Sequence, residues 1–180
     1  MSHGFKQITP TDHFSWHSAY LECYHRLFLP YREEECEVLE IGTDGGGGLR
    51  MYQDYFTKAK IVGMDISPTP DAVKNQPRIV HGQVDAYSTE GLLFTNAHCQ
   101  NLKVAVDDGP HTLGSQEFFA KNYPALLSSD GIAIIEDIAE HAHLSILQSC
   151  VGPEFFTMGI DLTHHDERRF DNRLLVIFRR

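Results

Sequence analysis

A run of glycines between two apolar segments constrains the fold of this chain more than any other feature. Residues 38–41 (VLEI) are predicted to form a buried strand, and the segment TDGGGG leads from it into a helix over about 49–57. A second apolar strand, 61–64, is followed by Asp65. Because glycine lacks a side chain, this loop can turn sharply and bring backbone N–H groups close to a ligand at the helix N-terminus. The pattern indicates the strand-loop-helix-strand unit of a nucleotide site.

Two acids indicate what kind of ligand this loop binds. The glycine spacing is not the G-x-G-x-x-G of dinucleotide-binding folds, and Glu40 lies two residues before Gly42. A carboxylate there repels a pyrophosphate but suits a cationic ligand without phosphates, and S-adenosylmethionine (SAM) fits this description. Asp65 is placed to accept hydrogen bonds from ribose hydroxyls. We therefore predict SAM contacts at Glu40, Gly42, Gly45 and Asp65, with a glycine-rich turn that binds nothing as the alternative.

The chain as a whole has the composition of one globular domain. Its 180 residues are 42% hydrophobic and 22% charged, enough for one sizeable core. The net charge of −10 and the lack of a Lys/Arg stripe in the sequence argue against a nucleic-acid partner. No apolar run approaches the roughly 20 residues of a membrane helix, and the first residues lack the apolar region of a signal peptide. We expect a single domain over residues 1–180, cytoplasmic, with neither a nucleic-acid nor a membrane partner.

Strand-like and helix-like segments alternate along the chain. The expected elements are a helix at 12–28 that Pro30 ends, strands at 38–41, 61–64, 78–81, 103–106 and 132–135, helices at 49–57, 89–97, 115–127 and 140–148, and final strands at 155–160 and 174–178. The last two strands are expected to pair with each other in antiparallel fashion. This order predicts an α/β fold with a doubly wound, mostly parallel sheet and an antiparallel C-terminal pair, preceded by a helical lead-in over residues 1–36.

Carboxylates lie at or just after the carboxyl end of each of the first five strands. They are Glu40, Asp65, Asp85, Asp107, Asp108, Glu136 and Asp137. Because parallel strands bring their carboxyl ends to one edge of a sheet, these side chains should gather there. Like charges at close range destabilise a fold unless cations or hydrogen-bond donors compensate. The acidic edge therefore calls for positive charge and hydroxyl donors, although Asp108 and Asp137 could each also be a simple helix cap.

The acidic edge divides into two groups with different chemistry. The first four acids lie toward the glycine loop and suit the amines and ribose hydroxyls of SAM. Asp108, Glu136 and Asp137 are hard oxygen ligands without His or Cys among them, which favours Mg²⁺ over zinc, with Mn²⁺ or Ca²⁺ as alternatives. His111 follows Asp108 by three residues, and imidazole is a fitting proton acceptor near neutral pH.

These segments resemble those of a known enzyme family. The glycine loop with its preceding acid is similar to motif I of the class I SAM-dependent methyltransferases. More narrowly, the chain resembles the metal-dependent sugar O-methyltransferases of macrolide biosynthesis, of the macrocin and mycinamicin type. The segments that carry this resemblance are LEIGTDGGGGLRMYQDYF, VDDGPH, IIED, FDNRLLVIFR and the N-terminal TDHFSWHSAYLECYHRLFLPYR. The resemblance covers nearly the whole chain. It implies a Rossmann-like methyltransferase fold, SAM and Mg²⁺ as cofactors, and an acceptor hydroxyl on a sugar or similar polyol.

The resemblance also assigns roles to individual residues. It implies that Asp108, Glu136 and Asp137 hold Mg²⁺ and that His111 is the general base. It further implies SAM contacts at Glu40, Gly42, Asp65 and Asp107, with Gln83 or Asp85 near the adenine. One departure from the family is Asp44, which stands where glycine is usual.

The predicted reaction is transfer of the SAM methyl group to an acceptor hydroxyl. A divalent ion at the carboxylates would orient and acidify this hydroxyl, and His111 would take its proton. The alternatives are a catechol-like acceptor, a non-catalytic SAM-binding subunit and a dehydrogenase, the last disfavoured by Glu40 and the glycine spacing. The sequence leaves the oligomeric state open, with a homo-oligomer as one option.

Overall fold

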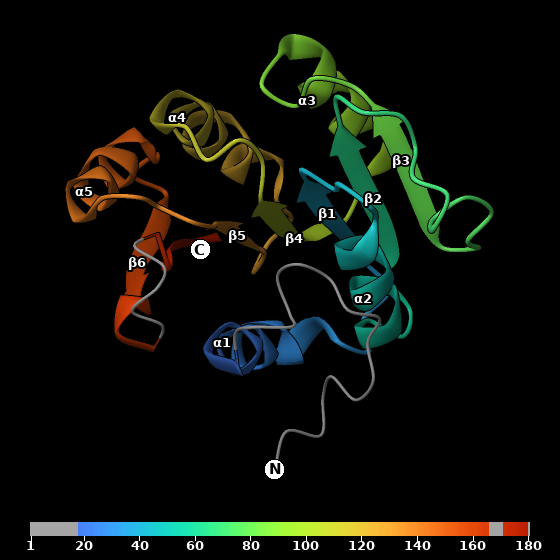
Figure 1. The fold of residues 1–180 in the computed structure, drawn as a ribbon, viewed down its shortest axis with the longest axis horizontal. Helices are drawn as coiled ribbons and strands as arrows, with labels where there is room; N and C mark the ends of the chain where they lie inside the picture. Colours follow the sequence, from blue (N-terminus) through green and yellow to red (C-terminus); the bar gives the residue numbers. More distant parts are fainter. Residues whose placement is uncertain (1–17, 166–170, 180) are drawn as a thin grey trace.

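A seven-stranded sheet forms the centre of the computed structural model, which describes residues 18–165 and 171–179 (Figure 1). The strands are β1 Glu37–Ile41, β2 Lys60–Asp65, β3 Ile79–Gln83, β4 Leu102–Asp107, β5 Ile132–Ile135, β6 Phe155–Asp161 and β7 Arg173–Arg179. Their order across the sheet is β3-β2-β1-β4-β5-β7-β6. The first five are parallel to one another, and β7 is antiparallel to both β5 and β6. The predicted doubly wound sheet with an antiparallel C-terminal pair is confirmed.

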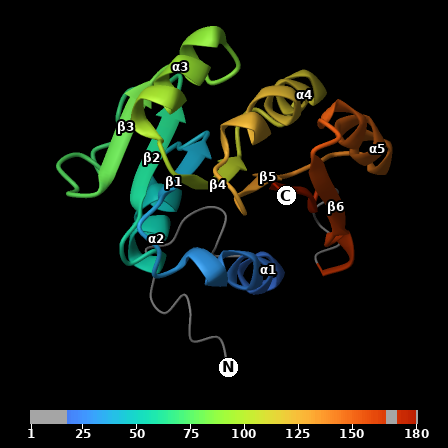
Figure 2. The same cartoon turned by 180° about the vertical axis from the view of Figure 1, so that it is seen from behind.

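Helices cover both faces of this sheet. They are α1 Ser18–Phe28, α2 Gly47–Tyr55, α3 Thr89–His98, α4 Leu113–Asn122 and α5 His141–Cys150, with 3-10 turns at Leu29–Tyr31, Pro124–Leu126 and Thr163–His165. Figures 1 and 2 show α1 and α2 on one face and α3, α4 and α5 on the other. Among the described residues, these helices cover most of both faces around β1, β4 and β5, whose side chains are nearly all buried.

The alternation of side chains along each strand divides the core into two layers. Val38 and Ile134 pack in the layer that contains α1 and α2. Their sequence neighbours Leu39 and Ile135 pack in the layer that contains α3, α4 and α5. All four side chains are buried, and each such aliphatic side chain stabilises the fold by roughly 1.5–3 kcal/mol relative to exposure. These layers fix the strand register and hence the positions of the strand ends.

The strand order changes direction between β1 and β4. The chain adds β2 and β3 on one side of β1 and then returns to add β4 on the other side. At this point the backbones are tied together, since Gly42 N–H donates to Met64 O at 2.9 Å and Asp108 N–H donates to Ile41 O at 2.9 Å. Open α/β sheets bind ligands outside the carboxyl ends of their strands at such a switch point. The junction of Gly42 and Asp108 is therefore where a site is expected.

Nearly all predicted elements lie within two residues of the observed ends in the described part of the chain. The helix predicted over 115–127 is wrong at its C-terminal end. Helix α4 ends at Asn122, because Pro124 has no N–H to continue the helical hydrogen bonds, and a separate 3-10 turn follows. In the glycine loop, Gly47 and Gly48 already belong to the first turn of α2. Residues 12–17 of the predicted first helix lie outside the described residues, and the single-domain prediction stays a prediction.

Candidate functional site

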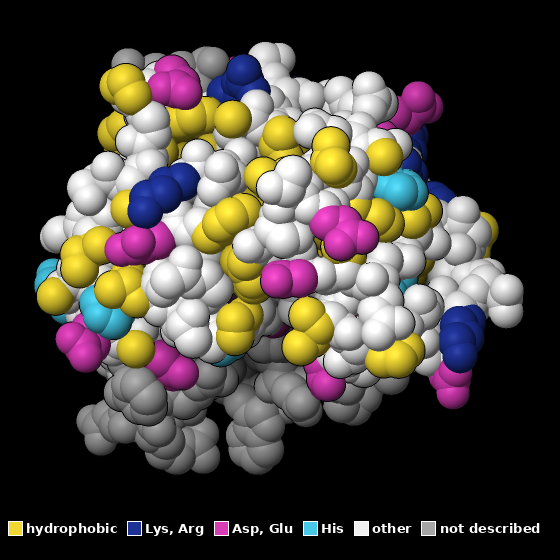
Figure 3. Space-filling view, turned by 90° about the horizontal axis from the view of Figure 1, so that it is seen from above, with side chains coloured by type: hydrophobic (Ala, Val, Ile, Leu, Met, Phe, Trp, Pro, Cys, Tyr) yellow, Lys and Arg dark blue, Asp and Glu magenta, His cyan; other side chains and the backbone are white. Residues whose placement is uncertain are grey.

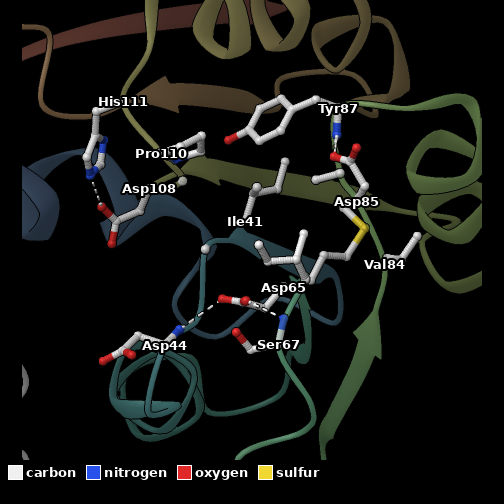
Figure 4. A pocket seen from close by; sticks show the side chains of 15 residues that line it. Ile41, Asp44, Asp65, Ser67, Val84, Asp85, Tyr87, Asp108, Pro110 and His111 are labelled. Atoms are coloured by element: carbon white, nitrogen blue, oxygen red, sulfur yellow. Dashed lines mark hydrogen bonds and ion pairs between the residues drawn. The ribbon is translucent and has the colours of Figure 1, made fainter.

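A pocket of about 500 Å³ opens at the switch point, within the usual size range of small-molecule sites. Its walls are the glycine loop, the ends of β2 and β3, and the turn of residues 108–111. Figure 4 shows Asp108 and His111 on one side of this space and Asp85 with Tyr87 on the other. The side chains of Ile41, Met64 and Val84 supply an apolar floor between them. The pocket thus brings Asp65 and Asp85 of the first predicted acidic group to the same space as Asp108 of the second.

The backbone of the glycine loop is fixed by close packing. Gly42 has φ of 81°, and a Cβ atom there would overlap the backbone carbonyl of Asp108. Gly46, with φ of 79°, is the N-cap of α2, and its N–H donates to Thr43 O at 2.7 Å. Asp44 also has positive φ, 38°, a conformation that favours glycine. The sharp turn predicted for this loop is confirmed at Gly42 and Gly46.

Asp65 ties this loop to the end of β2. One of its carboxylate oxygens accepts the N–H groups of Thr43 at 2.9 Å and Asp44 at 3.1 Å, and the other accepts that of Ser67 at 2.8 Å. Burial by itself would raise the pKa of Asp65, but the hydrogen bonds from Ser67, Thr43 and Asp44 hold it below its ordinary value. Asp65 therefore lines the pocket as a carboxylate, and its predicted contact to a ribose stays a prediction.

The predicted SAM residues divide between the pocket wall and positions behind it. Gly42, Asp65 and Asp85 line the pocket. Gln83 is exposed, and its amide donates to Ile66 O at 3.1 Å. The lining set contains none of Glu40, Gly45, Gln83 and Asp107. A direct ligand contact at these four positions stays a prediction.

Glu40 lies underneath the loop rather than in the pocket wall. It is 4% exposed, and a Cβ atom on Gly48 would overlap its carboxylate. The carboxylate is thus packed against the first turn of α2, where the positive end of the helix dipole favours negative charge. A residue larger than Gly48 would have to displace the end of the Glu40 side chain.

Asp107 is separated from the pocket by a tyrosine that the sequence reasoning missed. Asp107 is 2% exposed, and one of its oxygens accepts a hydrogen bond from the Tyr87 hydroxyl. Burial raises the pKa of Asp107 to about 7, although the hydrogen bonds from Tyr87 and from Gly109 N–H oppose this shift. Because Tyr87 lines the pocket, Asp107 supports its wall. The only sequence signal for Tyr87 was its place two residues after Asp85.

A candidate metal site lies at the other end of the pocket. Asp108, His111 and Asp137 each offer one ligand atom, and these atoms lie within 4.8 Å of one another. His111 Nε2 is 3.7 Å from Asp108 Oδ1 and 3.9 Å from Asp137 Oδ2. Both carboxylate side chains are 5% exposed, and His111 is 34% exposed toward the pocket. Two buried oxygen donors beside one imidazole fit a divalent cation, but the group holds His111 where the predicted all-oxygen set had Glu136.

Two residues of this site have positive φ, a backbone conformation that residues other than glycine rarely adopt. His111 has φ of 53° and Asp137 has φ of 49°. Non-glycine residues in this region cost about 1–3 kcal/mol, and they persist where the surrounding structure requires them. Two of the three residues in the group carry this cost, which is typical of a functional site.

Glu136, the third predicted ligand, is oriented by the N-terminal helix. Its carboxylate is buried and accepts a hydrogen bond from the Tyr24 hydroxyl, and it lies outside the group of three. Tyr20 of the same helix donates to Asp137 Oδ1 at 2.9 Å. Burial, with the nearby charge of Glu136, keeps the pKa of Tyr24 well above its ordinary value, so its hydroxyl remains a donor. The sequence predicted the helix that carries these tyrosines but not their contacts with the acids.

Comparisons with known proteins point to one group of enzymes, although no family model matches the chain. The demethylmacrocin O-methyltransferase of Streptomyces fradiae is 32% identical over 125 residues, 64% of this chain and 30% of that protein. The 8-demethyl-8-alpha-L-rhamnosyl tetracenomycin-C 2'-O-methyltransferase of Streptomyces olivaceus is 28% identical over 165 residues, 83% of this chain and 42% of that protein. Over these stretches the chain is similar to sugar O-methyltransferases.

The fold of the chain is also similar to that of a methyltransferase solved with its ligands bound. The MycE methyltransferase of the mycinamycin biosynthetic pathway, in complex with Mg, SAH and mycinamycin VI, is 30% identical with a TM-score of 0.59, over 66% of this chain and 34% of that chain. The predicted resemblance and the predicted Rossmann-like methyltransferase fold are confirmed. The chain spans only 30% to 42% of the length of these relatives.

Two features of the structure relate to the predictions of no nucleic-acid partner and no membrane partner. On the face in Figure 3, the Lys and Arg side chains of the described residues are scattered and form no stripe. Every helix within residues 18–165 and 171–179 is too short or too polar to cross a bilayer. The lack of a nucleic-acid partner, the compartment and the oligomeric state stay predictions.

Proposed function

We propose that this chain is a divalent-metal-dependent O-methyltransferase that moves the methyl group of SAM to a hydroxyl of a sugar or similar polyol. The observation that carries the proposal is the shared turn of residues 108–111. This turn lines the pocket beside the glycine loop and also supplies two of the three grouped metal-type side chains. The sugar O-methyltransferases among the homologues support the same reaction class.

The glycine-loop end of the pocket is the proposed SAM site. Gly42 and Asp65 would hold the nucleoside and methionine parts through the loop backbone and the ribose hydroxyls, with Asp85 near the adenine. The buried carboxylate of Glu40 adds negative potential beneath the loop, which favours a sulfonium ligand over a pyrophosphate. A volume of about 500 Å³ suits a ligand of this size.

The other end of the pocket is the proposed catalytic centre. When bound there, a divalent cation lowers the pKa of an acceptor hydroxyl and fixes its position. Asp108 and Asp137 would hold the cation, with Glu136 as the further predicted ligand. The acceptor oxygen forms a bond to the methyl carbon as the bond from sulfur breaks, and the sulfonium becomes a neutral thioether.

His111 is the proposed acceptor of the hydroxyl proton. Its ring faces the pocket, and the carboxylates of Asp108 and Asp137, at 3.7 and 3.9 Å, would stabilise the imidazolium that forms. The same distances also favour a second role, in which His111 is itself a metal ligand. The substitution His111→Ala separates these roles. A base predicts a turnover loss of about 10²–10⁴-fold with Mg²⁺ affinity retained, whereas a ligand predicts that both fall.

The proposed function is tested by calorimetry and methyl transfer on the purified chain. S-adenosylhomocysteine should bind with and without Mg²⁺, and methyl transfer from SAM to a panel of glycosylated acceptors should stop with EDTA and return with Mg²⁺. Transfer only to catechols would favour the catechol-type alternative. Binding of S-adenosylhomocysteine without any transfer would favour a non-catalytic subunit, and binding of NADH in its place would contradict a methyltransferase.

A further inference from the structure

Two tyrosines one turn apart on α1 contact the two successive acids that follow β5. Tyr20 donates its hydroxyl hydrogen to Asp137 Oδ1 at 2.9 Å, and Tyr24 donates to Glu136 Oε1. Residues four apart on a helix lie on the same face, so one face of α1 presents both hydroxyls to the acidic pair. The contacts join residues 117 and 112 positions apart in the chain.

Helix α1 is held rigidly in this position by an aromatic cluster. The Tyr24 ring stacks on Phe28 with centroids 4.9 Å apart, and Phe28 packs in turn against Tyr52 and Phe56 of the α2 region. A separate contact fixes the other side of the helix, where the Tyr55 hydroxyl lies 3.1 Å from a His25 ring nitrogen. The hydroxyls of the two tyrosines are therefore placed by packing that does not involve the acids.

The two oxygens of Asp137 have different partners. Oδ1 accepts the Tyr20 hydroxyl, while Oδ2 faces His111 Nε2 at 3.9 Å within the metal-type group. A hydrogen bond to one carboxylate oxygen fixes the rotation of the side chain and thereby aims the other oxygen. Asp137 is 4% exposed in a region with several other acids, so a donor at Oδ1 also stabilises its negative charge.

We propose that Tyr20 and Tyr24 are positioning residues of the metal site, which makes α1 a part of that site. Tyr20 aims Oδ2 of Asp137 toward Asp108 and His111, and Tyr24 fixes the carboxylate of Glu136, the further predicted ligand. This inference rests on the proposed function, because it assumes that a divalent cation binds at the group of three. It adds an element of the fold, more than 100 residues away along the chain, to the site.

The experiment compares Tyr20→Phe with Tyr55→Phe as a matched control. Both changes keep the aromatic ring and remove one hydroxyl. The Tyr20 hydroxyl donates from α1 to Asp137, whereas the Tyr55 hydroxyl contacts His25 of α1. We expect Tyr20→Phe to raise the dissociation constant for Mg²⁺ or Mn²⁺ alone, measured by calorimetry, by about 10–100-fold. Tyr55→Phe should leave it within about twofold, since no carboxylate loses a donor. Tyr24→Phe should raise it by a smaller factor than Tyr20→Phe.

Two further measurements separate positioning from a general loss of structure. Thermal unfolding midpoints should fall by similar amounts in Tyr20→Phe and Tyr55→Phe, because each loses one hydroxyl. At saturating Mn²⁺, the electron paramagnetic resonance spectrum should change in Tyr20→Phe only. Unchanged metal affinity in Tyr20→Phe, or an equal loss in Tyr55→Phe, would overturn the inference and leave the proposed function standing. A wild-type chain that binds neither cation would remove the proposed metal dependence and this inference together.

Discussion

The two ends of the pocket hold their acids in different ways. At the β2 end, Asp65 accepts N–H groups from Thr43, Asp44 and Ser67, which lie at most 22 residues away. At the β5 end, Glu136 and Asp137 accept tyrosine hydroxyls from a helix more than 100 residues away. The first end is formed by neighbouring segments of the chain, whereas the second takes two of its hydrogen bonds from the distant helix α1. The two ends should therefore respond to mutation independently.

The acids at the edge of the sheet have more hydrogen-bond donors within the protein than the sequence predicted. Seven acids at one edge were expected to need external cations and donors. In the described residues the chain itself supplies many donors, including the hydroxyls of Tyr20, Tyr24 and Tyr87 and the loop N–H groups. The acidic edge is thus tolerated partly without ligands. Asp108 and Asp137 are the acids that most need a cation, because they and His111 offer ligand atoms within 4.8 Å of one another.

The largest expected effect is on the affinities for Mg²⁺ and S-adenosylhomocysteine, which are proposed to bind at opposite ends of the pocket. Asp108→Asn removes a buried carboxylate from the metal-type group and should weaken Mg²⁺ binding by about 100-fold or more, because an amide is a much poorer ligand for a hard cation. Asp85→Asn, at the opposite end, should weaken S-adenosylhomocysteine about tenfold and leave Mg²⁺ binding within about twofold. Calorimetry on both variants checks this. Equal losses of both ligands in both variants would show that the pocket acts as one unit.

A smaller effect is expected at the residue that joins the two ends. Gly42→Ala places a Cβ against the Asp108 carbonyl at φ of 81°, so the free energy of unfolding should fall by about 2–4 kcal/mol. Gly45→Ala is the matched control, since nothing lies within 4 Å of its added Cβ, and it should change stability by less than about 0.5 kcal/mol. Urea denaturation measures both. Equal stabilities would mean that the loop and the turn can move apart at little cost.

Much of the fold and of the first end was predictable from sequence because both depend on local pattern. Apolar segments of four to six residues fixed the strands, and the acids at their ends followed from the parallel arrangement. Gly42 and Asp65 were identified by their place next to those strands, and both line the pocket. Short-range signals were sufficient here because the contacts themselves are short-range.

The second end was predictable only in its residue types. The sequence indicated a metal group of Asp108, Glu136 and Asp137 with His111 nearby, whereas the structure groups Asp108, His111 and Asp137. The pairing of Glu136 with Tyr24 depends on how α1 packs across the sheet. A tyrosine at a helical core position is usually just a buried ring, so its hydroxyl partner has no sequence signature. The strand order likewise depends on the whole sheet, and the sequence carried no direct signal for it.

The smallest effect tests whether the first end is held by charge. Because the pKa of Asp65 is lower in the folded chain than its ordinary value of about 3.8, its carboxylate stabilises folding above that pH, and this contribution is lost as the pH falls through the lowered pKa. Asp65→Asn keeps an acceptor oxygen but removes the charge. The variant should be less stable than wild type by no more than about 1 kcal/mol at pH 7, since solvent screens this partly exposed group.

That difference should shrink as the pH falls below about 4, as measured by urea denaturation at each pH where both proteins stay folded. The sign follows from the depressed pKa, because protonation of Asp65 in the wild type gives it the same neutral charge as asparagine. A difference that stays constant with pH would mean that the N–H groups of Thr43 and Asp44 need only an acceptor and not a charge. In that case the negative potential at this end comes mainly from buried Glu40, and a sulfonium ligand would depend on Glu40 more than on Asp65.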